Sequence, residues 1–173
     1  FTIKFCMKNN MKLIFAWKRE RRTNSEAYKR ELNFFKKYLT EIELDYLFSN
    51  SSEKINENYT SYMTMFRSKV VVGFWSTMLR ENLAIGGKIL SCNLTSTNIW
   101  DFPIEGICSI KNCSYEEFEK RLNEIYLMSK EDYFLKLNKD KSYAMEYDEK
   151  ISTIELVKNK IDYFLSNGRS LKI

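Results

Sequence analysis

The chain contains no histidine among its 173 residues. Within these residues, this absence excludes Ser-His-Asp and Cys-His catalysis and any histidine general base. A zinc site would have to be built from thiolates or carboxylates alone. Any proton transfer must therefore use carboxylates, or a group that lies outside the sequence.

Paired cysteines and long apolar runs are also missing. The 4 cysteines form no C-x-x-C pair, which predicts free thiols in a reducing compartment. No apolar run reaches the roughly 18 residues that span a bilayer. The opening FTIKFCMKNN lacks a signal-peptide pattern. We expect a soluble cytoplasmic protein, with peripheral attachment to a membrane left open.

The chain also has no long run of residues with the same charge. The net charge is +5, and basic residues alternate with acidic ones along the chain, which does not favour nucleic-acid binding. The one basic cluster is KRERR at residues 18–22, directly after the apolar run 13–17. At the carboxyl end of a strand such a cluster commonly holds phosphate, although a solvated loop explains it equally well.

What the chain does contain is enough apolar sequence for one core. Hydrophobic residues make up 44% and aromatic residues 15%, and we find no internal repeat or interdomain linker. We therefore expect residues 1–173 to form a single domain. Because the first residue is phenylalanine, we also expect it to be the C-terminal part of a longer chain.

Apolar periodicity predicts alternating strands and helices. Strands are expected at residues 13–17, 45–48, 70–74, 88–92 and 106–110, and helices at residues 26–39, 59–66 and 77–85. Three capping boxes, beginning at Ser114, Ser129 and Ser152, predict a C-terminal helical tail whose apolar stripes face the core. The fold class is therefore α/β, a Rossmann-like doubly wound parallel sheet with its ligand at the carboxyl ends of the strands.

The segment SKVVVGFWSTMLRENLAIGG, residues 68–87, has the layout of a phosphate-binding crevice. A run of three valines predicts a buried strand, and Gly73 allows a close approach. Ser76 and Thr77 follow where a helix should begin, so their hydroxyls and the first-turn N–H groups would face an anion. Glu81 lies one turn further on, where a carboxylate can bind two sugar hydroxyls.

Simpler explanations exist for the two hydroxyl residues and for Arg80 on the same helix. Ser76 and Thr77 would serve only as helix caps in an isolated strand–Ser–Thr–helix unit. Arg80 on the helix surface is more often solvated than turned into a crevice.

The segments SKVVVGFWSTMLRENLAIGGKILSCN, SYEEFEKRLNEIYLMSKEDYF and YAMEYD resemble the C-terminal, nucleotide-sugar-binding half of GT-B glycosyltransferases. The similarity spans residues 13–165 and is closest to surface-carbohydrate and capsule biosynthesis transferases. It implies that Ser76, Thr77 and a basic residue, Lys18 or Arg19, contact the donor phosphates, with Arg80 as a further candidate. It also implies that Glu81 holds the ribose hydroxyls. Residues 49–52 and side chains near Tyr62 would flank the base.

The resemblance implies transfer of a sugar from a nucleotide donor to a glycan or lipid-linked acceptor. The N-terminal half of a GT-B enzyme is not in this sequence, so a further half or a partner subunit is expected. No Asp-x-Asp motif occurs, which fits a reaction without a metal or other cofactor. The alternatives are a non-catalytic nucleotide-sugar-binding subunit or sensor, and an enzyme similar to nucleotide-sugar 2-epimerases.

Overall fold

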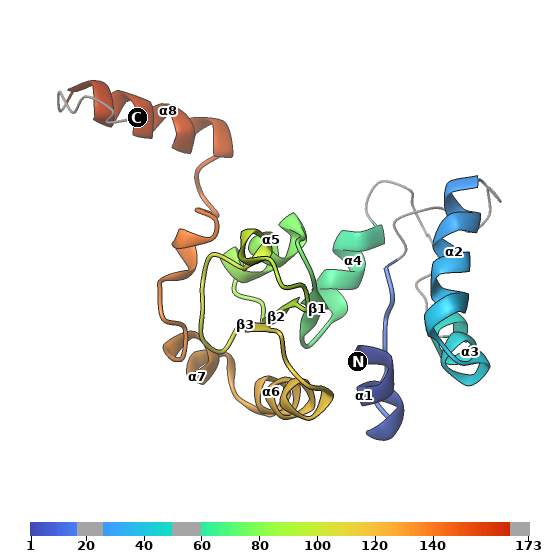
Figure 1. Ribbon diagram of the computed structural model, residues 1–173. Helices are drawn as coiled ribbons and strands as arrows, with labels where there is room; N and C mark the ends of the chain where they lie inside the picture. The colour runs from blue at the N-terminus through green and yellow to red at the C-terminus, as the bar shows by residue number, and fades with distance from the viewer. Residues whose placement is uncertain (17–25, 50–59, 167–173) are drawn as a thin grey trace.

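The computed structural model describes residues 1–16, 26–49 and 60–166 (Figure 1). Its first four helices are α1 (Thr2–Lys8), α2 (Glu26–Tyr38), α3 (Glu41–Ser49) and α4 (Thr60–Arg67). The central part contains β1 (Val71–Gly73), α5 (Thr77–Ala84), β2 (Ile89–Asn93), the 3-10 turn η2 (Asn98–Trp100) and β3 (Ser109–Lys111). The C-terminal part contains α6 (Tyr115–Leu127), α7 (Lys130–Leu135), the 3-10 turn η3 (Lys141–Tyr143) and α8 (Thr153–Ser166).

The three strands form a parallel sheet in the order β1-β2-β3. Val72 pairs with Leu90, and Ser91 pairs with Ser109. All five residues of the central strand β2 are buried, whereas the two edge strands are only partly buried. The strands predicted at 70–74, 88–92 and 106–110 are therefore confirmed, with boundaries shifted by one to three residues.

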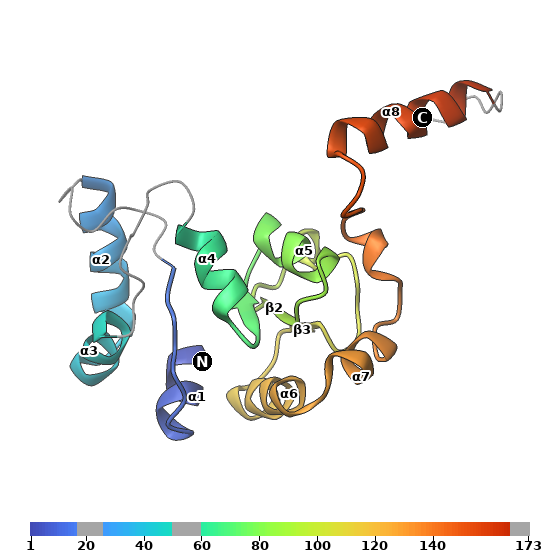
Figure 2. The same ribbon diagram turned by 180° about the vertical axis from the view of Figure 1, so that it is seen from behind.

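Helices cover both faces of the sheet. In both views α5 lies over one face, with α6 and α7 over the other (Figures 1 and 2). Phe118, Leu122 and Ile125 of α6 are buried in the same hydrophobic cluster as Leu79 and Leu83 of α5. This is a mixed α/β arrangement around a parallel sheet, consistent with a Rossmann-like fold. The described strands follow one another in sequence order without a reversal, so the doubly wound sheet stays a prediction from the sequence.

Two of the predicted strands are wrong. Residues 45–48 belong to helix α3, not to a strand. The backbone N–H of Thr40 donates to the Glu43 carboxylate at 2.9 Å, and the Glu43 N–H donates to the Thr40 hydroxyl at 3.3 Å. This capping box starts α3 and is visible in the sequence, but the apolar residues that follow it read equally well as a short strand.

The second wrong strand is the one predicted at residues 13–17. Within its described part, residues 13–16, only Phe15 forms a single β-bridge. Leu13 instead contacts both hydrophobic clusters of the protein. Helix α1, which lies before it, was not predicted from the sequence. The helices expected at 26–39 and 59–66 correspond to α2 and α4 and are confirmed.

The helix starts of the C-terminal part are confirmed. Ser114 accepts a hydrogen bond from the Glu117 N–H at 3.2 Å, and the Glu117 carboxylate accepts one from the Ser114 N–H at 2.7 Å. The Ser129 hydroxyl accepts from the Asp132 N–H at 3.0 Å. The Ser152 hydroxyl accepts from the Glu155 N–H at 3.3 Å. Each hydroxyl satisfies a first-turn donor that has no partner inside its helix.

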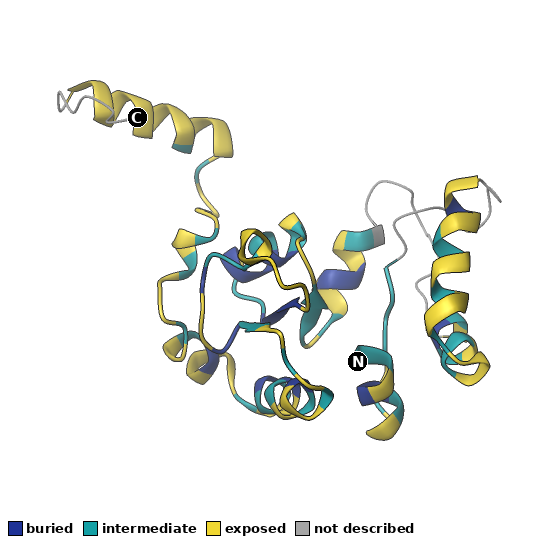
Figure 3. Cartoon of the chain, viewed as in Figure 1, coloured by how far each residue is buried: buried dark blue, intermediate teal, exposed yellow. Residues whose placement is uncertain are grey.

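The last helix does not pack as expected. Helix α8 projects away from the sheet in both views, and almost its whole surface is exposed (Figures 1 to 3). Ile154, Val157, Ile161 and Phe164, which were expected to face the core, are all exposed. Periodicity shows which side of a helix is apolar, but it does not show whether another element lies against that side.

Among the helices that the structure describes, none combines the length and the apolar character needed to cross a bilayer.

Candidate functional site

The three parallel strands end at the same edge of the sheet, at Gly73, Asn93 and Lys111. In open parallel sheets the crevice outside the carboxyl ends of the strands is the usual ligand site. The turns that follow β1 and β2 carry most of the polar and aromatic side chains considered below. We refer to this region as the carboxyl edge.

The turn after β1 is made by Trp75. Its φ of +44° lies in the left-handed region, which is a genuine outlier for a bulky side chain. The nearest atoms to a Cβ added at Gly73 would be Leu79 side-chain atoms at 3.5 Å, which is ordinary contact. The chain therefore turns sharply one residue before the helix cap, and the strain falls on a tryptophan that is 53% exposed.

Ser76 occupies the N-cap of α5, with extended backbone angles of φ −122° and ψ 132°. Its side chain makes no capping hydrogen bond to the helix, although its carbonyl accepts from the Leu79 N–H at 3.1 Å. Its hydroxyl is therefore not committed to the first turn of the helix. Thr77 is the first residue of α5 and is exposed.

Glu81 and Arg80 lie one turn into α5. At helical spacing, Glu81 shares a face with Thr77, and Arg80 shares one with Ser76. The Glu81 Oε2 atom is buried and receives no hydrogen bond from the described part of the chain. A hydrogen bond to the Glu81 carboxylate raises the pKa of Tyr62, which belongs to α4. Four of the residues singled out in the sequence thus lie on α5 or at its N-cap, and Tyr62 lies beside Glu81.

The other two predicted residues, Lys18 and Arg19, fall outside the described residues. Their assignment as phosphate ligands stays a prediction from the sequence.

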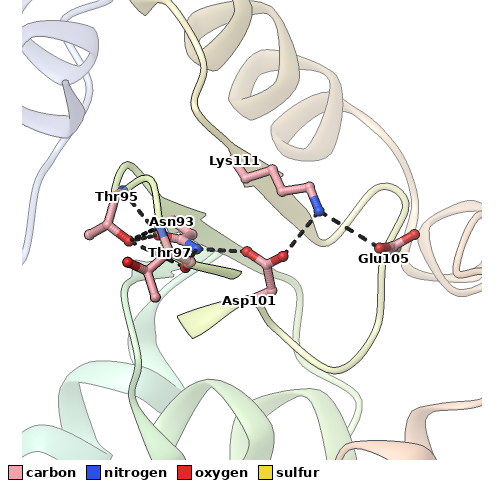
Figure 4. Close-up of polar contacts among 6 residues, drawn as sticks. All are labelled: Asn93, Thr95, Thr97, Asp101, Glu105 and Lys111. Atoms are coloured by element: carbon pink, nitrogen blue, oxygen red, sulfur yellow. Dashed lines mark hydrogen bonds and ion pairs between the residues drawn. The ribbon is translucent and has the colours of Figure 1, made fainter. Parts of the chain in front are cut away.

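A second polar group lies at the ends of β2 and β3 (Figure 4). Asn93 is buried, and its Nδ2 donates to the Asp101 carboxylate at 2.6 Å and to the Thr97 carbonyl at 3.0 Å. Its Oδ1 accepts from the Thr95 N–H at 3.0 Å and from the Thr95 hydroxyl at 2.7 Å. Lys111 Nζ donates to the other Asp101 oxygen at 3.0 Å. We call Asn93, Thr95, Asp101 and Lys111 the polar cluster.

Hydrogen bonds set the charge state of this cluster. The bond from Asn93, followed by the bond from Lys111, lowers the pKa of Asp101. The Asp101 carboxylate in turn raises the pKa of Lys111. Both groups are therefore ionised at neutral pH, which suits binding of hydroxyl or phosphate oxygens better than proton transfer.

The polar cluster borders a hollow of about 430 Å³ beside β3. Asp101, Glu105, Lys111 and Arg121 line it together with Ser109. Arg121 holds the loop before β3, because its Nη1 donates to the Gly106 carbonyl at 2.6 Å and the Ser109 carbonyl at 3.2 Å. The polar cluster could not be predicted from the sequence, because its members are up to 18 residues apart (Asn93 to Lys111) and meet only when β2 and β3 pair.

Two tryptophans connect the turn after β1 with the turn after β2. The rings of Trp75, after β1, and Trp100, in η2, meet edge to face with centroids 4.5 Å apart. Trp100 is directly followed by Asp101 of the polar cluster. The edge therefore presents, in order, the α5 N-terminus, an aromatic pair and a group of ionised and amide side chains.

The remaining chemistry of the described residues is limited. Burial raises the pKa of the Cys92 and Cys108 thiols to about 12, so neither forms a thiolate nucleophile at neutral pH. All four cysteines are free thiols, as predicted. In the part of the chain that the structure describes, no three Cys, Asp or Glu side chains are grouped so that they would hold a metal ion.

Comparison with known families assigns the chain. Residues 1–161 match the model of a family described as "putative O-antigen biosynthesis protein". The chain belongs to this family. Neither a curated protein nor a solved structure matches it. O antigen is a surface polysaccharide, so the family agrees with the surface-carbohydrate role that the sequence resemblance implied. The match does not extend to the GT-B fold or to a defined reaction.

The matched range covers the carboxyl edge completely. It includes α5, the tryptophan pair and the polar cluster, but it stops within α8.

Proposed function

We propose that the chain binds a nucleotide sugar at the carboxyl edge, as the donor-binding part of a glycosyltransferase in polysaccharide biosynthesis. The observation that carries this proposal is the Glu81 Oε2 atom, which is buried without a hydrogen-bond donor in the described structure. A buried acceptor without a donor costs about 1–3 kcal/mol. A ligand hydroxyl that reaches Glu81 would remove that cost.

The donor diphosphate would lie at the start of α5. The first-turn N–H groups of a helix lack partners inside the helix and carry its partial positive charge. The uncommitted Ser76 hydroxyl and the exposed Thr77 hydroxyl stand at this end. Arg80 is one turn away and would add a full positive charge. Together these groups match the needs of a diphosphate that leaves from the sugar.

The ribose would lie over Glu81. A carboxylate accepts hydrogen bonds from two vicinal hydroxyls, and Oε2 is the atom that lacks a donor. Tyr62 faces the same carboxylate from α4. In this proposal the nucleoside lies on the α4 side of the edge, and the phosphates lie over α5. Transfer to a glycan or lipid-linked acceptor, with a further half or partner subunit, completes the proposal.

A nucleotide-sugar-binding subunit without transfer activity of its own is the second candidate. Asp101 favours it, because the hydrogen bonds from Asn93 and Lys111 hold its pKa below the ordinary range. An acid with a lowered pKa is a weak general base. Asp101 is therefore suited to ligand binding, and a catalytic base would have to come from elsewhere.

Isothermal titration of the chain with UDP-, GDP- and CMP-linked sugars tests the proposal. We expect one nucleotide class to bind, and Glu81→Gln and Ser76→Ala each to weaken it about tenfold, the effect of losing one hydrogen bond to a charged group. Glu149→Gln, a matched change at an exposed glutamate outside the edge, should leave affinity unchanged. Binding that Glu81→Gln does not weaken would refute the ribose assignment.

Transfer is measured separately from binding. Release of the nucleotide from the bound donor, with and without a lipid-linked acceptor, distinguishes a transferase from a binding subunit. Tight binding without release under either condition would favour the second candidate.

A further inference from the structure

The tryptophan pair is incompletely buried, although its two rings contact each other. Trp75 is 53% exposed and Trp100 is 37% exposed, although both are large apolar side chains. Trp75 also keeps a left-handed backbone, with φ +44°, which costs a bulky residue on the order of 1–3 kcal/mol. Backbone strain and exposed aromatic side chains are both typical of ligand-binding sites.

The surroundings of the pair indicate the kind of ligand. On one side stands the α5 N-terminus, with Ser76 and Thr77. The polar cluster, which Figure 4 shows, follows Trp100 directly in the chain at Asp101. An indole face attracts the weakly positive C–H groups of a sugar ring, and the carboxylate, amide and ammonium groups beside it suit the ring hydroxyls. The pair combines both requirements.

The polar cluster has bonding capacity left for such hydroxyls. Each Asp101 oxygen accepts one hydrogen bond, from Asn93 or from Lys111, and each can accept another. Lys111 Nζ makes one short ion pair, at 3.0 Å to Asp101, and its contact with Glu105 is at 4.0 Å. Donors and acceptors therefore lie together beside an aromatic surface, as vicinal hydroxyls on a ring require.

We propose that Trp75 and Trp100 bind the pyranose ring of the sugar, with Asp101 and Lys111 on its hydroxyls. The inference rests on the proposed function, because that function fixes the direction of the donor. With the nucleoside near Glu81 and Tyr62 on the α4 side and the diphosphate at the start of α5, the sugar extends toward η2 and β3. Trp75 directly precedes Ser76 at the start of α5, its ring contacts that of Trp100, and Asp101 of the polar cluster directly follows Trp100.

The test separates the sugar from the nucleotide. Affinities for UDP, GDP and CMP are compared with those for the corresponding nucleotide sugars, in the wild type and in Trp75→Gly and Trp100→Ala. We expect each variant to weaken the nucleotide sugar about tenfold, the order of one lost aromatic contact and its buried area, and to change the affinity for the free nucleotide less than twofold.

The test needs a variant that folds and a control away from the site. Trp75→Gly should fold at least as well as the wild type, because glycine adopts φ +44° without strain. Tyr38→Ala removes an exposed aromatic residue on α2, away from the carboxyl edge, and should not alter binding. An equal loss of affinity for nucleotide and nucleotide sugar would overturn the proposal, since the pair would then contact the nucleotide. So would no loss at all.

Free methyl glycosides distinguish failure of this inference from failure of the proposed function. Saturation-transfer NMR should show contact between ring protons of the glycoside and the wild-type protein, lost in the Trp75→Gly Trp100→Ala double variant. If no nucleotide binds but this contact is present, the sugar site stands and the nucleotide assignment is wrong. If the glycosides make no tryptophan-dependent contact, the sugar site is refuted.

Discussion

A single tyrosine side chain binds the backbone of the central strand β2 at its first residue. Tyr133 of α7 is fully buried, and its hydroxyl accepts from the Ile89 N–H at 3.1 Å and donates to the Ile89 carbonyl at 2.9 Å. β3 pairs with β2 only from Ser91 onward, so Ile89 has no strand neighbour on that side. The phenol takes the place of that neighbour, and burial raises its pKa.

Tyr133→Phe should therefore destabilise the protein by about 2 kcal/mol, because it leaves two buried backbone groups without a partner. Urea unfolding followed by circular dichroism measures the change. Tyr143→Phe is the matched control, since Tyr143 is exposed, and it should have no effect. Equal stabilities of Tyr133→Phe and the wild type would show that water or backbone movement satisfies Ile89.

Asp101 should make stability depend on pH. Its pKa lies below the ordinary 3.8 because of hydrogen bonds from Asn93 and Lys111. An acid with a lowered folded pKa contributes stability above its unfolded pKa, and this contribution is lost as the pH falls through the folded value. The melting temperature of the wild type should exceed that of Asp101→Asn at pH 7, and the gap should shrink as the pH falls below about 4 and through the folded pKa of Asp101. A gap that stays constant would contradict this.

At the scale of elements, α6 and α8 show that helices with the same apolar pattern can differ in burial. Both helices have an apolar stripe at helical spacing and a serine at the start. Phe118, Leu122 and Ile125 of α6 are buried against the sheet, whereas the stripe of α8 is exposed. Local sequence specifies each helix and its apolar side, and only neighbouring elements decide whether that side is buried.

The same substitution in both helices tests this difference. Ile125→Ala should cost about 2–5 kcal/mol, because Ile125 is fully buried and leaves a cavity. Ile161→Ala should change stability by less than about 0.5 kcal/mol, because Ile161 is 53% exposed. Denaturant unfolding of both variants gives the comparison. A large loss in Ile161→Ala would mean that α8 packs against a partner in solution.

At the scale of the whole molecule, the core is divided in two. One cluster surrounds the sheet and includes Leu90 and Tyr133. A second, smaller cluster lies between α2 and α3 around Tyr28 and Leu47. Leu13 packs against both clusters. Because the smaller cluster buries fewer apolar side chains, we expect it to open at a lower free energy than the sheet.

Hydrogen exchange measured by mass spectrometry tests this order. Amides of β2 should exchange most slowly, those of α2 and α3 faster, and those of α8 fastest. Addition of a bound nucleotide sugar should slow exchange at the start of α5 more than in α2. Uniform exchange rates across β2, α2 and α8 would contradict two separate cores.

Local sequence alone determined much of this protein. The valine run specifies strand β1, and Ser114, Ser129 and Ser152 specify helix starts, because each signal lies within a few residues of what it controls. The same holds for Thr77, Arg80 and Glu81, which share one short helix. Their grouping follows from helical spacing, although their ligand stays a prediction.

Only the tertiary structure decided the rest. Asn93, Asp101 and Lys111 meet because β2 and β3 pair, and Trp75 meets Trp100 because two separate connections return to the same edge of the sheet. Helix α8 is exposed because no described helix or strand covers its apolar side. Such contacts join residues distant in sequence, and no local preference specifies them, because their free energy arises only when the strands and helices have packed.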